Sequence, residues 1–410
     1  MKLRSLALLG GILLSGAATA GGYQVNLQGQ KQIGMGHTGT GLAMDEASVF
    51  FNPGAMSHLR QNGFQVGMSG IISKIAYQES APGNATAKTD NPLGSPFTVY
   101  GVFGKEESDL KFGLGIYTPY GSTVNWGEQW AGRFGLTELK LTAVFFQPTV
   151  SYKLGDKVGI GGGLVYANGL VNLKRGIPLQ DQQGNEGRAE LDGGASGWGF
   201  NAGLYFKPSE QFSVGLTYRS KVTMKVKDGD ATFTVPASLA SRFPATTFNA
   251  ELPLPANITL GIGFTPTEKL TIAADVQRVN WSAYQKLRFD YAEAVNGALF
   301  SENARNYEDA MIYRLGLQYQ LTEAFALRAG AYYDNSPVQD GYLTPETPDA
   351  DARGLSCGIG YRFSEKIQLD ASFLYINKKE RTDASDMSGG IGGTYKAVAY
   401  IPGLAVSYKF

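Results

Sequence analysis

The chain has 410 residues, with 36 acidic and 36 basic side chains and a formal net charge of zero. This balance argues against a nucleic-acid partner and against an electrostatic membrane anchor. The one cysteine excludes an intrachain disulfide, and no apolar run is long enough for a membrane-spanning helix. Abundant glycine, tyrosine and phenylalanine instead favour many short strands whose backbones approach closely.

Residues 1–20 have the three parts of a secretory signal peptide. Lys2 and Arg4 give a basic start, and an apolar run that is too short to span a bilayer follows them. The small residues at 18–20 form the site that a signal peptidase reads. We therefore expect an exported protein whose mature form begins at Gly21.

Residues 21–61 show no alternation of apolar and polar side chains and precede the first strand pattern. This segment can hang free or fold into the interior of the strands that follow, which would otherwise enclose a wide, water-filled bore. We expect it to fold inward as a plug, because part of it is apolar enough to require burial. The residues behind this expectation are aromatic or turn-forming: Phe50, Phe51, Asn52, Pro53 and Gly54.

Residues 62–410 consist of segments in which apolar and polar side chains alternate. In 367–375, for example, every second residue is apolar or aromatic, as in a strand with one apolar face. Short turns alternate strictly with long connections, and this pattern predicts fourteen strands. The short turns are expected at 105–108, 154–157, 207–211, 265–269, 321–323 and 363–366, and the long connections near 79–94, 118–138, 176–188, 227–248, 291–305, 335–350 and 381–393.

Short turns at one end and long loops at the other are typical of an outer-membrane β-barrel. The sheet must close on itself, because an open edge in hydrocarbon would leave backbone groups unpaired. The last strand ends on Phe410, which resembles the C-terminal aromatic signal by which the barrel assembly machinery recognises such proteins. The fold class we predict is all-β, a 14-stranded antiparallel transmembrane barrel of residues 62–410 with an N-terminal plug in its lumen.

Charged residues within the strands support this geometry. They fall on the row opposite the aliphatic side chains, where the lumen would be, since an arginine facing lipid would cost about 2 to 4 kcal/mol. Pairing and hydration of the barrel interior is their simplest role. Cys357 lies on the lipid-facing row, and we assign it no chemistry. The expected inward residues are Arg219, Arg314, Arg328, Arg362, Asp275 and Asp370.

The connection at 118–138 is rich in aromatic residues. Trp126, Trp130 and Phe134 recur at a spacing of four, which places them on one face of a short helix, and Tyr120 lies at the base. An apolar patch that faces external water usually marks a binding surface, so we expect ligand capture here. Alternatively, these rings pack on another loop, such as 229–256, and close the top of the barrel.

The sequence also resembles the FadL/TodX family of outer-membrane transporters for hydrophobic compounds. Asp-Glu-Ala-Ser at 45–48 is followed by Asn52 and Pro53, as in the plug of that family, although Gly54 stands where the family usually has alanine. Glycine frees the backbone, so the local turn is expected to differ. Further family-like blocks, in the same order along the mature chain, are TPYGSTVNW at 118–126, GWGFNAGLYFKPSEQFSVGLTYRSKV at 197–222, LPLPANITLGIGF at 252–264, VNWSAYQKL at 279–287 and YRLGLQYQLTEAFALRAGAYYDNSPV at 313–338.

The resemblance implies a route for a hydrophobic ligand. External loops capture it, an apolar pocket inside the barrel holds it, the plug rearranges, and the ligand leaves sideways through a gap in the wall. In the family this gap comes from an inward kink of the third strand, here 109–121. Gly113 and Gly115 would permit the bend, and Pro119 cannot donate to a strand ladder. Ordinary barrel glycines are the alternative.

A carboxylate ligand would need a cation in the pocket. The resemblance places such a cation at Arg288, after the Trp-Ser pair of the ninth strand, and another at Lys174 or Arg175 on the fifth strand. Each of these could equally be a solvated charge at a loop edge. Aromatic hydrocarbons would need no cation.

We therefore expect an outer-membrane protein, monomeric and surrounded by lipid, that passively takes up hydrophobic small molecules, most plausibly long-chain fatty acids. Uptake of aromatic hydrocarbons, a general porin, and an adhesin or structural barrel are the alternatives. No cofactor, metal or nucleic acid is expected. An enzyme is disfavoured, because the only histidines are His37 and His58, both in the plug, and no nucleophile or phosphate-binding motif occurs.

Overall fold

The computed structural model describes residues 22–105 and 108–410. The expected signal peptide lies outside these residues, as do two positions of the turn expected at 105–108. Nearly all of the described chain outside the N-terminal segment is strand and connecting loop.

Among the described residues, no helix has the length and apolar character needed to pass through a bilayer.

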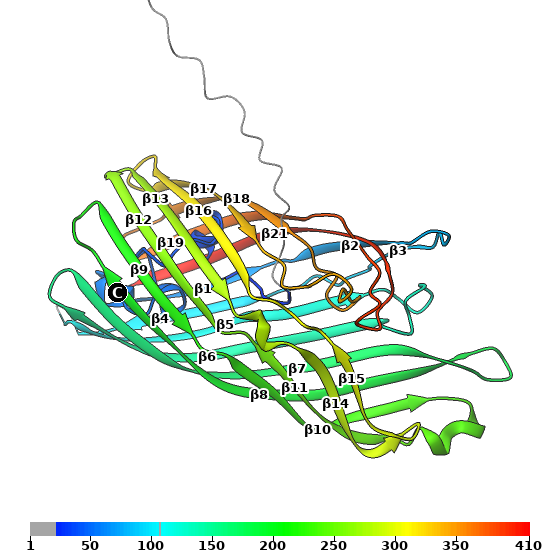
Figure 1. Cartoon of the computed structure of the whole chain (residues 1–410). Coiled ribbons are helices and arrows are strands. Elements are labelled where there is room, and N and C mark those ends of the chain that lie inside the picture. Colours follow the sequence, from blue (N-terminus) through cyan, green and yellow to red (C-terminus); the bar gives the residue numbers. More distant parts are fainter. Residues whose placement is uncertain (1–21, 106–107) are drawn as a thin grey trace, which may run out of the picture.

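The strand segments form one antiparallel sheet of 21 members, shown in Figure 1. They are β1 (Gly63–Ser69), β2 (Ile72–Glu79), β3 (Thr86–Lys88), β4 (Phe97–Phe103), β5 (Leu110–Asn125), β6 (Glu138–Leu154), β7 (Val158–Gln180), β8 (Glu186–Phe206), β9 (Phe212–Arg219), β10 (Val222–Thr234), β11 (Thr246–Leu254), β12 (Asn257–Thr267), β13 (Leu270–Val279), β14 (Lys286–Val295), β15 (Ala298–Ala304), β16 (Ala310–Gln320), β17 (Phe325–Asp334), β18 (Ala352–Arg362), β19 (Ile367–Lys378), β20 (Arg381–Asp383) and β21 (Gly393–Lys409).

The sheet closes into a barrel, because β1 pairs with β21 from Gly63 opposite Lys409 to Ser69 opposite Gly403. Seven pairs of consecutive segments each continue as one strand of the wall, so the 21 segments make fourteen strands. The predicted fourteen-stranded closed antiparallel barrel is confirmed. The seven pairs are β1 and β2, β3 and β4, β9 and β10, β11 and β12, β13 and β14, β15 and β16, and β19 and β20.

Two connections expected to be long loops are strand instead. The region 176–188 belongs mostly to β7 and β8, which are joined by residues 181–185 alone. The region 291–305 contains the hairpin of β14 and β15, whose turn is Asn296 and Gly297, with φ of 49° and 82°. Both residues tolerate positive φ, so this Asn-Gly pair forms a two-residue hairpin turn that the sequence analysis overlooked.

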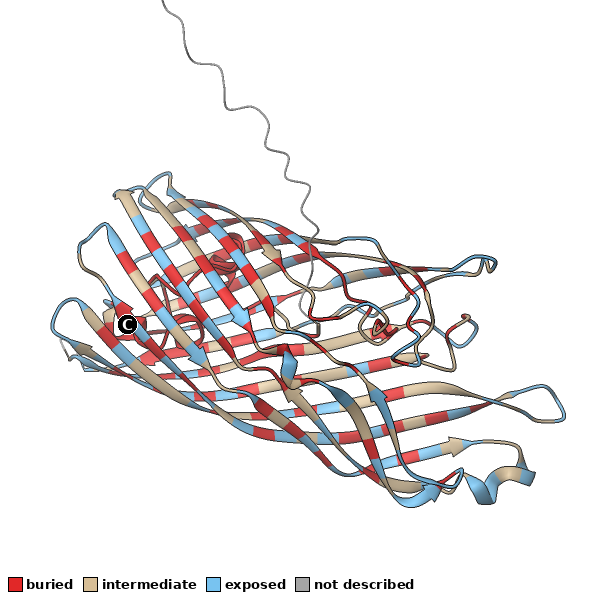
Figure 2. Cartoon of the chain, viewed as in Figure 1, coloured by how far each residue is buried: buried red, intermediate tan, exposed pale blue. Residues whose placement is uncertain are grey.

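The alternation of burial along the strands matches the expected two faces, as the banding in Figure 2 shows. Leu315 and Leu317 are 52% and 40% exposed on the outside of β16, whereas the neighbouring Arg314 is buried. Arg328, Asp275 and Asp370 are likewise buried inside the barrel, and Arg219 is half-buried there; Cys357 is exposed on the outside. Arg362 was expected inside but is exposed, because it is the last residue of β18 and borders a turn.

Residues 22–61, here called the plug segment, lie inside the barrel near the end that carries the C-terminus (Figure 1). The segment contains α1 (Gln30–Gly34), α2 (Ser48–Phe51) and the 3-10 helix η1 (Ala55–His58). Helix α1 contacts β17, β18 and β19, whereas α2 contacts β5 and η1 contacts β5 to β8. Of the two remaining 3-10 turns, η2 (Ala237–Arg242) lies in the loop between β10 and β11, and η3 (Trp281–Ala283) lies between β13 and β14 with Trp281 buried.

Glycines in the wall allow this close packing. A Cβ on Gly203 of β8 would lie 2.3 Å from Asn52 Oδ1, and one on Gly54 would lie 2.6 Å from the Gly159 carbonyl oxygen. Gly54 itself has φ of −67°, which alanine also adopts, so close approach and not backbone freedom explains glycine at this position. Other wall glycines on which a Cβ would come within 3 Å of the plug segment are Gly63, Gly113, Gly159, Gly161, Gly215, Gly261, Gly263, Gly316, Gly330 and Gly403.

Candidate functional site

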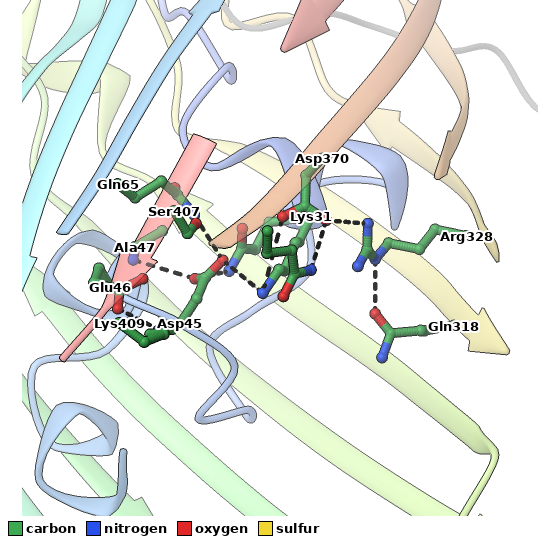
Figure 3. A network of polar contacts seen from close by, with 12 residues as sticks. Lys31, Asp45, Glu46, Ala47, Gln65, Gln318, Arg328, Asp370, Ser407 and Lys409 are labelled. Atoms are coloured by element: carbon green, nitrogen blue, oxygen red, sulfur yellow. Dashed lines mark hydrogen bonds and ion pairs between the residues drawn. The ribbon is translucent and has the colours of Figure 1, made fainter. Parts of the chain in front are cut away.

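A buried charged network fastens the plug segment to the wall (Figure 3). Asp45 lies 3.6 Å from Lys31 Nζ, and its carboxylate accepts hydrogen bonds from Gln32 Nε2 at 2.9 Å and from Gln65 Nε2 of β1 at 3.0 Å. Burial alone would raise the pKa of Asp45, but Lys31 and the two amides outweigh burial and hold this pKa below its ordinary value. The carboxylate therefore stays ionised at neutral pH.

The network continues into other wall strands. Lys31 Nζ also lies 4.0 Å from Asp370 of β19, which forms an ion pair of 2.8 Å with Arg328 Nη1 of β17. Glu46 pairs with Lys409 of β21. The plug segment is thus held on both sides of the seam where the barrel closes, by an amide of β1 and by charges of β19 and β21, in an interior where breaking one partner is costly.

The Asn52-Pro53-Gly54 turn is also tied to the wall. Asn52 Nδ2 donates to the Thr40 carbonyl at 2.8 Å and to the Leu204 carbonyl of β8 at 2.9 Å. Its Oδ1 accepts from the Gly54 amide at 2.9 Å. Asn52 therefore bridges two parts of the plug segment and the barrel with one side chain.

Phe50 and Phe51 of the plug segment are buried and face other aromatic and charged groups. The Arg219 guanidinium lies 3.9 Å above the Phe50 ring, and its Nη2 donates to the Phe50 carbonyl at 2.8 Å. Phe50 also meets Tyr117 of β5 edge-on at 5.0 Å, and Phe51 lies 4.8 Å from His37. Both phenylalanines border a small polar chamber between the plug segment and the wall.

The wall is interrupted beside β5. Pairing between β4 and β5 ends at Thr98 and Tyr117, and the register against β6 shifts between Tyr117 and Tyr120. Beyond this point the backbone of β5 is hydrogen-bonded to the plug segment. The Val25 amide donates to the Pro119 carbonyl at 2.8 Å, and the Gly121 amide donates to the Tyr23 carbonyl at 3.1 Å. A short stretch of the plug segment thus takes the place of a neighbouring strand.

Of the three residues expected at the gate, only Pro119 lies at this interruption, whereas Gly113 and Gly115 do not. Pro119 lies within the register shift. Gly113 and Gly115 belong to the regularly paired part of β5, where their missing side chains make room for Met56 and Val49 of the plug segment. At the gap, a wide cleft is lined by residues of the plug segment, by β2, β5, β6, β17, β19 and β21, and by the connection before β4.

An apolar cavity with a volume of about 80 Å³ lies inside the barrel next to the plug segment. Tyr23 and Tyr120 border it where the plug segment meets β5, and its walls come from β6, β7, β10, β11 and β14. At its polar edge Arg305 Nη2 lies 3.4 Å from Glu346 Oε1, and Arg305 Nε donates to the Tyr284 hydroxyl at 3.3 Å. Apart from this edge the lining is apolar, so the cavity favours alkyl or aromatic groups over polar ones.

The three predicted carboxylate-binding cations do not line this cavity. Arg288 lies on the outward face of the β14 hairpin, where it bonds to Asp290 at 2.6 Å and covers the Phe300 ring at 4.0 Å. Lys174 pairs with Glu138 at 3.2 Å in a polar hollow among the outer loops, which Arg175 also lines.

Arg305, which was not among the predicted cations, borders the apolar cavity. It directly follows β15, within a region expected to be loop, so its position relative to a strand could not be read. The Asn-Gly turn at 296–297 was the signal that would have placed it at the foot of a hairpin.

The tryptophans of the loop after β5 are covered, not exposed. Trp126 and Trp130 are each 5% exposed, and their rings stack with centroids 4.5 Å apart. Trp126 Nε1 donates to the Pro345 carbonyl at 3.0 Å, and Trp130 lies edge-on to Tyr77 at 5.5 Å. The two tryptophans therefore pack against another loop, as the alternative prediction stated. The loop that they contact is 335–350, not the suggested 229–256.

The predicted helix in this loop is wrong, because residues 126–137 form turns. Turns do not repeat every four residues in space, so Phe134 points elsewhere and stacks under the Arg133 guanidinium at 4.4 Å. Tyr120 is separate from the tryptophans as well. It faces the interior and donates a hydrogen bond to the Pro255 carbonyl at 3.2 Å.

No group of three or more histidine, cysteine, aspartate or glutamate side chains in the described ranges is arranged to hold a metal ion.

Known proteins share this architecture over almost the whole chain. The chain is 28% identical to the 47 kDa outer membrane protein of Pasteurella multocida, over 97% of this chain and 96% of that protein. It is 24% identical to the long-chain fatty acid transport protein of Escherichia coli, with coverage of 89% and 90%. The crystal structure of a Pseudomonas aeruginosa FadL homologue superposes with a TM-score of 0.83 at 19% identity, covering 95% of this chain and 100% of that one.

The model of the family described as outer membrane protein transport protein (OMPP1/FadL/TodX) matches residues 11–410. The expected outer-membrane location agrees with these relatives. The chain therefore belongs to the OMPP1/FadL/TodX family of outer-membrane transporters for hydrophobic compounds.

Proposed function

We propose that this protein passively takes up long-chain fatty acids across the outer membrane. The observation that carries the proposal is the apolar cavity inside the barrel, which Tyr23 of the plug segment separates from the interruption of the wall beside β5. The relative from Escherichia coli, a long-chain fatty acid transport protein, supports the choice of ligand.

The route begins at the outer loops. The stacked pair Trp126 and Trp130 is tied to loop 335–350, whose Glu346 borders the cavity. Opening of these covered aromatic rings would expose an apolar surface that captures the ligand, and their closing would bury it. Capture thus involves a movement of loops, in place of the permanently exposed patch that the sequence suggested.

Release is sideways, into the bilayer. Displacement of Tyr23 to Val25 from β5 would join the cavity to the cleft in the wall, with Pro119 at the point where the strand pairing is already interrupted. Sideways exit keeps an alkyl chain out of water, at a saving of about 0.8 kcal/mol for each CH2. The Asn52-Pro53-Gly54 turn and the two phenylalanines before it would stay fixed or shift slightly, because the wall holds them on several sides.

Aromatic hydrocarbons are the second candidate ligands. Tyr23, Tyr284 and Phe289 present rings to the cavity, and Arg305 is already paired with Glu346, so a neutral ring needs no new partner. A general porin is disfavoured, because the plug segment occupies the lumen.

Uptake assays distinguish these functions. A bacterial strain that lacks its own uptake proteins for hydrophobic compounds, complemented with this gene, is expected to accumulate labelled oleate faster than the empty strain. Faster uptake of toluene alone would replace the fatty-acid assignment by the aromatic one. Uptake of neither, together with large and stable conductance in planar bilayers, would favour a porin and overturn the proposal.

A further inference from the structure

The polar chamber below the apolar cavity has features of an anion site. It has a volume of about 30 Å³, enough for a small polar group, and lies between the plug segment and strands β9, β12, β13 and β16. Arg219 and Arg314 project into it from the wall, and Asp275 is the one carboxylate among its lining residues. Its formal charge is therefore positive.

Asp275 does not neutralise the two arginines by direct contact. Its Oδ2 accepts the amides of Gly39 and Thr40 at 3.0 and 3.1 Å, so this oxygen is engaged by the plug segment. Arg314 Nη2 donates to the neutral Gln277 Oε1 at 2.8 Å, and Arg219 Nη2 donates to the Phe50 carbonyl.

Both guanidinium groups keep a buried N–H without a partner. Within the part of the chain that the structure describes, the Nε–H groups of Arg219 and Arg314 are shielded from solvent and donate to no protein acceptor. His37 adds no charge, because burial and the two arginines hold its pKa well below the ordinary value. Buried donors on fixed positive charges favour an anionic oxygen as their partner.

The chamber also lies on the proposed route. Tyr120 borders the apolar cavity, the chamber and the cleft in the wall, and residues 24–26 border both the chamber and the cleft. In the apolar cavity, by contrast, Arg305 is already paired with Glu346. A ligand with an apolar tail in the cavity and an anionic head would find its unpaired cations in the chamber.

We propose that Arg219 and Arg314 form a binding site for the carboxylate head group of an amphipathic ligand and select carboxylates over neutral molecules of the same length. The Phe50 ring below Arg219 gives the methylenes next to the carboxylate an apolar surface. This inference rests on the proposed function in one respect: the tail must reach the apolar cavity.

Binding to purified protein tests the site directly. Equilibrium dissociation constants for oleate and for oleyl alcohol are measured for the wild type, for Arg219→Gln and Arg314→Gln singly and together, and for Arg314→Lys. The double variant is expected to bind oleate about tenfold to a hundredfold more weakly while oleyl alcohol is unaffected, since each lost bond to a charge is large. Lysine at 314 is expected to restore part of the loss. Arg288→Gln, on the outward face, is the matched control and is expected to change neither constant.

Two outcomes would overturn the site. Equal oleate affinity in the wild type and the double variant would show that the arginines do not meet the carboxylate. Equal weakening for both ligands would show a structural role, and heat-modifiable migration of the folded barrel on gels checks for this. Wild-type protein that binds oleate but mediates no uptake in cells would refute the proposed function and leave the site supported.

Discussion

The contact between Gly203 and Asn52 illustrates how closely the plug segment lies against the wall. Side-chain amide and strand backbone meet with no room for a methyl group. Asn52 at the same time donates two hydrogen bonds to carbonyls and accepts one from an amide, so a small shift would leave several buried groups unpaired. The site is sensitive to single atoms.

Gly203→Ala is therefore expected to loosen the plug segment. The new methyl would lie 2.3 Å from Asn52 Oδ1, and overpacking of this kind costs about 1 to 3 kcal/mol. Limited proteolysis of the folded protein measures the effect as faster cleavage within residues 22–61. Gly194→Ala, also on β8 but with nothing within 4 Å of the new methyl, is the control and should cleave like the wild type. Equal cleavage of both variants would show that the contact between Gly203 and Asn52 does not hold the plug segment.

Single residues were predictable from sequence where strand parity alone decides their position. Arg314, Arg328, Asp275 and Asp370 lie inside as expected, because alternate residues of a strand face opposite sides. The identity of the cation beside the apolar cavity was not predictable in this way, because it depends on how far the strands extend beyond the bilayer. Arg305 was missed for this reason.

At the scale of elements, the plug segment behaves as a separate body held by charge and by backbone pairing. Its helices are short, and no side chain caps the first residues of α1, α2 or η1. Their stability must come from packing and from the network around Asp45, because isolated helices of this length are unstable in water.

Acid is expected to release the plug segment. The pKa of Asp45 is lower in the folded protein than in an unfolded chain, so its ion pair stabilises above pH of about 4 and is lost as pH falls through the lowered value. Hydrogen exchange of residues 22–61 at pH values from about 7 to about 3 should show this loss. Asp45→Asn should exchange faster at neutral pH and depend less on pH, whereas Glu365→Gln on an exposed turn should match the wild type. If Asp45→Asn showed the same pH dependence of hydrogen exchange as the wild type, the Asp45 carboxylate would not be what holds the plug segment.

The whole barrel was the most predictable level, because its strand count follows from alternating short and long connections. The gap in the wall was harder to locate. The third strand offered Gly113, Gly115 and Pro119, and the ladder is interrupted only at Pro119. The plug segment uses the two glycines for packing and supplies its own strand at the interruption. Such a replacement depends on residues far apart in the chain and has no local pattern.

Covalent closure of this gap tests whether the whole molecule releases ligand sideways. Gln24 and Tyr120 face each other in an antiparallel bridge, and the backbone hydrogen bonds lie on either side of them. In such a non-hydrogen-bonded pair the Cα atoms are about 4.5 Å apart. This distance is within the range of about 4.4 to 6.8 Å that a disulfide allows. In a Cys357→Ser background, Gln24→Cys with Tyr120→Cys is expected to abolish oleate uptake when oxidised and to recover it on reduction. Tyr120 also lines the apolar cavity, so Tyr120→Cys alone is the control for the effect of removing this side chain from the cavity.

Oleate binding to the oxidised, purified protein completes this test. Retained binding without uptake would place the block after capture, as expected if Tyr23 to Val25 must leave β5 before the ligand can exit. Full uptake by the oxidised protein would mean that the ligand passes elsewhere, and the sideways route beside β5 would have to be abandoned. Because the bridge joins the plug segment to the wall at one point only, the fold and the apolar cavity should remain intact in either case.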